Sequence, residues 1–128
     1  MRKIILLLIF LLATSCTQIK LAREAYDQND YREAITISKK ILTADSTNID
    51  ALEIISNAYT HLNILDSAIV FSEALLQLTP QNSLYTKNLY DLYIAQGEQY
   101  LPGDPKTALP IFESAEALAP DLALAFEK

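Results

Sequence analysis

Apolar residues recur along most of this chain at steps of three and four, the spacing of one face of an α-helix. The clearest run carries small and large residues on one face: Ala68, Phe71, Ser72, Leu75 and Leu76. Start signals precede such runs, since Asp30 with Glu33 resembles a capping box, and Asn63 and Asp66 are candidate caps. We expect helices over 17–28, 31–44, 48–62, 65–78, 82–100 and 106–118.

An internal repeat underlies these helices. Ala34 and Ala68 are 34 positions apart, and each follows a bulky residue by three places and precedes an isoleucine. Further pairs keep this spacing: Leu21-Ala22 with Ile55-Ser56, Ile41-Leu42 with Leu75-Leu76, and Asp45-Ser46 with Thr79-Pro80. Ala108 continues the series 40 positions after Ala68, six more than the norm. Small residues at these positions let helices approach where they cross.

The repeat resembles the tetratricopeptide repeat. Its framework positions are matched by Leu52, Ile55, Ser56, Tyr59, Ala68, Ser72, Leu75 and Pro80. The resemblance implies an all-α fold, a right-handed superhelix of about three antiparallel helix pairs. The repeats are expected at about 17–48, 49–82 and 83–120, within a domain that covers 16–128. Residues 121–128 are expected to form a short C-terminal capping helix, or else an apolar edge that pairs with a partner or a second copy.

Two residues, Gly97 and Pro110, constrain the predicted helix boundaries. Gly97 inside a helix costs about 1 kcal/mol relative to alanine, so a break at this position is an alternative to a helix that continues to Tyr100. Pro110 suits only the first turn of a helix, which places the start of the last helix at 105–107. The cap interpretation of the C-terminal segment places Leu122, Ala125 and Phe126 against the third repeat.

The first fifteen residues have the pattern of a secretory signal peptide. Two basic residues precede an apolar run over 4–13, and small residues follow it. A retained membrane anchor is the alternative, but this apolar run is about half as long as a bilayer span needs to be. We therefore expect residues 1–15 to be removed on export.

Cys16 is the only cysteine, so no internal disulfide can form. The segment 12–16 resembles the lipobox of bacterial lipoproteins, although Ala13 stands where leucine is usual. The resemblance implies that Cys16 carries a diacylglycerol and an acyl chain such as palmitate. Thr17 in place of aspartate implies the outer membrane, and the lack of an acidic run after it favours the periplasmic face. Ordinary signal-peptidase cleavage after Ser15 is the alternative.

Charge and residue types exclude several function classes. Without the leader, eight basic residues face sixteen acidic ones, a net charge of −8, which disfavours nucleic acid and anionic membrane surfaces. No phosphate-binding loop or set of metal ligands stands out, so we expect no cofactor and no metal. His61 is the sole histidine, and no catalytic pair is visible. We expect a protein that is not an enzyme.

A protein-interaction adaptor or scaffold remains as the leading hypothesis. In stacked repeats the first helix of each pair lines a concave surface, which suits a peptide or a helix of a protein partner. Projection of the helical period places ten side chains there: Lys20, Arg23, Tyr26, Asp50, Glu53, Asn57, His61, Lys87, Asn88 and Asp91. One alternative is a structural module that self-assembles through its C-terminal edge. Another is that the chain is the N-terminal part of a longer exported repeat protein.

Overall fold

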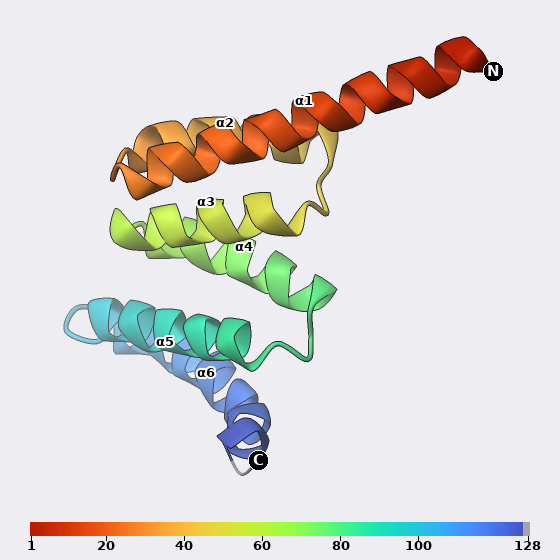
Figure 1. Cartoon of the computed structure of the whole chain (residues 1–128). Coiled ribbons are helices and arrows are strands. Elements are labelled where there is room, and N and C mark those ends of the chain that lie inside the picture. Colours follow the sequence, from red (N-terminus) through yellow and green to blue (C-terminus); the bar gives the residue numbers. More distant parts are fainter. Residues whose placement is uncertain (127–128) are drawn as a thin grey trace.

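Helices and the short turns between them make up the described part of this chain, as a computed structural model shows (Figure 1). The structure describes the backbone of residues 1–126, with side chains apart from those of 11–13 and 121–126. Six helices follow one another: α1 (Arg2–Asp27), α2 (Tyr31–Ala44), α3 (Ile49–His61), α4 (Leu65–Leu78), α5 (Ser83–Tyr100) and α6 (Pro105–Phe126). They pack as antiparallel pairs, and the pairs stack in sequence order. The all-α fold of paired helices predicted from the sequence is confirmed.

The first and the last helix differ from the sequence predictions. The helix α1 begins at Arg2 rather than at residue 17, because the apolar leader is itself helical and joins the first repeat without a break. The helix α6 starts within the predicted 105–107, but Pro110 lies beyond its first turn. It also runs through Pro120 to Phe126, so the backbone of 121–126 continues α6 and forms no separate capping helix. The predicted contacts of Leu122, Ala125 and Phe126 lie outside the described side chains.

Side-chain caps explain why several helices begin where they do. Each cap is an oxygen that accepts a backbone N–H of the first turn: Asp30 from Glu33, Asn48 from Ala51, Asn82 from Leu84 and Tyr85, and Asp104 from Thr107. The predicted role of Asp30 is thus confirmed. The helix α4 differs, since its N-cap is Ile64 and no side chain caps it. The prediction that Asn63 or Asp66 caps this helix is wrong.

Asn63 instead closes the preceding helix. Its φ of 56° lies in the left-handed region, as does the φ of 63° at Asn29, the equivalent position of the first repeat. The backbone N–H of Ile64 donates to the carbonyl of Tyr59, and that of Asn63 donates to Thr60, both at 3.0 Å. This is the Schellman pattern, which satisfies the last carbonyls of a helix. Asparagine tolerates the left-handed region better than most residues, which explains its use at both turns.

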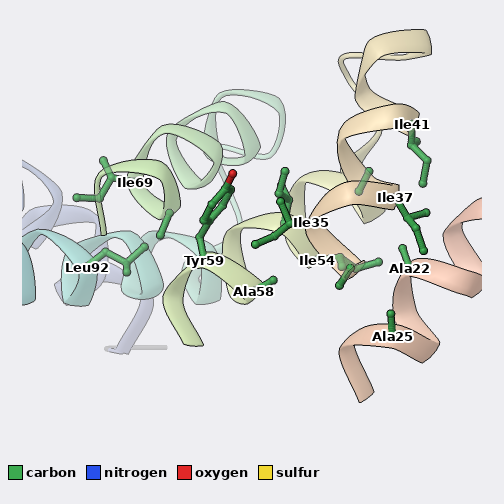
Figure 2. Packing of buried hydrophobic residues seen from close by; sticks show 14 of the residues in the cluster. Ala22, Ala25, Ile35, Ile37, Ile41, Ile54, Ala58, Tyr59, Ile69 and Leu92 are labelled. Carbon is green, nitrogen blue, oxygen red and sulfur yellow. The ribbon is translucent and has the colours of Figure 1, made fainter. Parts of the chain in front are cut away.

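The largest core cluster is formed by buried apolar side chains of α1 to α5 (Figure 2). The three repeat alanines at positions 34, 68 and 108 are fully buried, as their spacing predicted. Isoleucines such as Ile35 and Ile55 are buried within this cluster. The helix α5 continues through Gly97, which is buried, so the break considered there does not occur. This packing places α1 beside α3, while α5 packs against α4 and α6.

Candidate partner-binding groove

A pocket of about 370 Å³ opens between α3 and α5, with α4 behind it. Four of the predicted groove residues line it, Glu53 and Asn57 from α3 and Asn88 and Asp91 from α5. Each pair is spaced by three or four residues, so both members lie on one helical face. The structure therefore brings together four of the seven predicted side chains of the second and third repeats.

Tyr85 joins the two helices at this pocket, and the sequence analysis missed it. Its hydroxyl donates a hydrogen bond to Glu53 Oε2 at 2.5 Å. This hydrogen bond, with burial as the second cause, raises the pKa of Tyr85 from 10.0 to about 12. Tyr85 stands three residues before Asn88, so the helical period could have placed it on the same face.

The inner wall of the pocket is well packed. Ser56 of α3 and Ser72 of α4 share a hydrogen bond between their hydroxyl groups, and Ser56 also donates to the carbonyl of Ala68 at 3.3 Å. Leu75 and Leu92 add buried apolar surface beside them. Packing and these hydrogen bonds hold the inner wall in place beneath the polar side chains of the pocket.

Arg23 and Tyr26, two of the predicted residues of the first repeat, lie outside this pocket, against side chains of α3. Arg23 forms an ion pair with Asp50 at 3.3 Å, and both side chains are about half exposed. The ring of His61 stacks on Tyr31 with centroids 4.6 Å apart and meets Tyr26 edge to face at 5.6 Å.

Lys20 and Lys87 complete the ten predicted residues, and both are exposed. Lys87 pairs with Asp91 one turn later in α5 at 2.5 Å. Exposed pairs of this kind are worth at most about 1 kcal/mol. The predicted surface is thus divided between a pocket that α3 and α5 line and a set of side-chain contacts between α1 and α3.

Cys16 lies within α1 and is exposed. The helix that contains it is long and apolar enough to cross a membrane, with a mean hydropathy of 2.1 over its most apolar stretch and none of that stretch buried. Its place near the N-terminus is also that of a signal sequence, so the apolar helix is compatible with one. Within the described part of the chain, no three His, Cys, Asp or Glu residues are grouped to hold a metal ion.

Comparison with solved structures identifies the fold. The thermophilic TPR protein TTC0263 of Thermus thermophilus superposes with a TM-score of 0.67 at 19% identity, over 84% of this chain and 55% of that one. MamA AMB-1 superposes with a TM-score of 0.61 at 21% identity, over 82% of this chain and 59% of that one. The chain therefore spans a little over half the length of either structure.

Sequence comparisons add nothing to this. No protein-family profile matches the chain. No curated protein matches it in sequence either. The structural likeness and the three antiparallel helix pairs show a helical-repeat fold like that of tetratricopeptide-repeat proteins.

Proposed function

We propose that this chain is an adaptor or scaffold that binds a peptide or helix of a protein partner in the groove between α3 and α5. The observation that carries the proposal is the pocket of about 370 Å³, where polar side chains from two successive repeats converge above a packed inner wall. Ligand sites usually combine such a concave shape with a few convergent polar groups. The fold supports the same interpretation, since stacked repeats offer extended concave surfaces for binding and are typically not catalytic.

We further propose that Cys16 carries a lipid that anchors the protein at the bacterial outer membrane, on its periplasmic side. The apolar helix before Cys16 and the exposed position of Cys16 support this. Two or more acyl chains anchor a protein stably, whereas one does not. Because α1 continues from Cys16 into the first repeat without a linker, the repeats would lie close to the lipid surface.

The lipid anchor is tested by the intact mass of the protein from the membrane fraction. The expected species begins at Cys16 and is heavier by a diacylglycerol and an acyl chain. An unmodified chain that begins at Cys16 would show a soluble exported protein instead, and a retained leader would show a membrane-spanning helix. Cell fractionation is the second measurement, and the Cys16→Ala variant is expected to be absent from the membrane fraction.

Groove binding is tested with a photo-crosslinking amino acid in cells. The position of Asn88 lies in the pocket, while Val70 of α4 is 59% exposed and does not line it, so Val70 provides the matched control. We expect a discrete crosslinked protein from position 88 and none from position 70. Equal products from both positions, or none from position 88, would refute binding in the groove.

A further inference from the structure

We infer that the pocket between α3 and α5 receives a basic side chain, arginine or lysine, from the bound partner. This inference rests on the proposed function, because it names the chemical group that the groove recognises. It concerns the part of the groove lined by Glu53, Asn57, Asn88 and Asp91.

Charge is the first argument. Two carboxylates, Glu53 and Asp91, line the pocket, and none of its lining residues is a lysine or arginine. Both ion pairs among the described residues, Arg23 with Asp50 and Lys87 with Asp91, leave Glu53 without a cationic partner. Glu53 is half-buried, and the Coulomb attraction between a cation and such a carboxylate is stronger than that of an exposed surface pair.

The hydrogen bond from Tyr85 orients Glu53 without neutralising it. The phenol is uncharged, and its pKa, raised to about 12, keeps the proton on the tyrosine at physiological pH. Glu53 Oε2 is thus held toward α5 across the pocket. A carboxylate held in place loses little side-chain entropy when it binds a cation, so the site is already arranged for one.

Further lining groups match the shape of a basic side chain. The amide oxygens of Asn57 and Asn88 are acceptors near the carboxylates, and a guanidinium offers five N–H donors in a fixed fork. Three buried leucines of the lining, Leu65, Leu75 and Leu92, supply apolar surface for the methylene stem. A volume of about 370 Å³ lies at the small end of the range for ligand pockets, which suits one side chain of a peptide.

The first experiment uses N-acetyl-arginine amide as the probe and the purified full chain in detergent as the target. Nuclear magnetic resonance follows the side-chain amides of Asn57 and Asn88. We expect saturable shifts of both signals, and none with N-acetyl-norleucine amide, which has an uncharged stem. Equal shifts with both probes, or no shift with the arginine probe, would overturn the inference.

The decisive variant is Glu53→Gln, whose amide oxygen can still accept the Tyr85 hydrogen bond. It should weaken binding of the arginine probe about tenfold, as loss of a charge-assisted hydrogen bond does. Glu98→Gln is the matched control, since Glu98 is an exposed carboxylate of α5 outside the pocket. Equal effects of the two variants would contradict a specific role for Glu53.

Crosslinking separates this inference from the proposed function. In cells, Glu53→Gln should reduce the product formed from position 88 about tenfold, while Glu98→Gln should leave it unchanged. If position 88 crosslinks equally in both variants, the groove binds a partner but not through a basic side chain. If position 88 forms no product in the unchanged protein, the proposed function fails and the inference fails with it.

Discussion

Gly97 of α5 lies directly against the aromatic ring of Phe112 of α6. A Cβ atom at position 97 would stand 2.6 Å from both Cε1 and Cζ of that ring, closer than real Cβ atoms approach a neighbour. The absence of a side chain at Gly97 therefore lets the two helices of the third repeat pack closely. The helix tolerates a residue of poor propensity because the close contact offsets its cost.

Gly97→Ala should destabilise the protein even though alanine is the better helix former. Overpacking of a core costs about 1–3 kcal/mol, which exceeds the gain of about 1 kcal/mol in helix propensity. The measurement is the midpoint of urea unfolding followed by circular dichroism. Gly103→Ala is the control, because no atom lies within 4 Å of a Cβ there and the φ of Gly103 is not positive. A variant at position 97 as stable as the one at 103 would refute this packing role.

Ser72→Ala should lower stability and Ser38→Ala should not, although the two serines are equivalent in the repeat. Ser72 shares a buried hydrogen bond with Ser56, so its loss should cost about 1 kcal/mol. Ser38 Oγ is buried and has no hydrogen-bond partner among the described residues. Removing an unsatisfied hydroxyl should leave stability unchanged or raise it by up to about 1 kcal/mol. The free energy of unfolding of both variants is measured with denaturant. Equal decreases in this free energy would contradict the prediction.

The difference between these serines has a visible origin in the sequence. Ala22 is the repeat equivalent of Ser56, so the first repeat has a methyl group where the second has a hydroxyl. Ala22 is thus the residue that would pair with Ser38, and its methyl group can neither donate nor accept a hydrogen bond. Ala22→Ser is expected to supply one.

Substitutions at Asn63 should separate backbone strain from side-chain contacts. Asn63→Ala and Asn63→Gly both remove the 3.3 Å hydrogen bond from Gln99. Only alanine opposes the positive φ of 56°, at a cost of about 1–2 kcal/mol. The glycine variant should therefore be more stable than the alanine variant by about 1 kcal/mol in thermal or urea unfolding. If the two variants have the same unfolding midpoint, the left-handed conformation does not explain why asparagine occupies this turn.

Stability should fall in alkaline solution through Tyr85. The folded protein raises the pKa of Tyr85 from 10.0 to about 12, so the unfolded chain loses this proton first as the pH rises. The stabilisation is complete below pH 10 and disappears as the pH rises through about 12. We expect unfolding midpoints of the wild type to fall more steeply in this window than those of Tyr85→Phe. Parallel pH profiles would show that the hydrogen bond to Glu53 does not persist in solution.

Local sequence patterns were enough to predict the helices and their pairing. The bounds of α2 and α4 agree with the predicted 31–44 and 65–78 at both ends, and the alanines at 34, 68 and 108 are buried as predicted. These features depend on helical periodicity, on caps such as Asp30 and on small residues at fixed spacing. All of them act over a few residues or recur from one repeat to the next, so they can be recognised without knowledge of distant contacts.

Which side chains meet depends instead on the tertiary structure. The hydrogen bond between Glu53 and Tyr85 joins α3 to α5, and the helical period alone does not tell which rotamers make it. The same holds for Ser56 with Ser72 and for Gly97 with Phe112. The period also placed ten residues on one surface, whereas four of them line the pocket. The offset and rotation of stacked helices follow from the packing of the whole core. A local sequence pattern does not specify this packing, because it depends on contacts between distant residues.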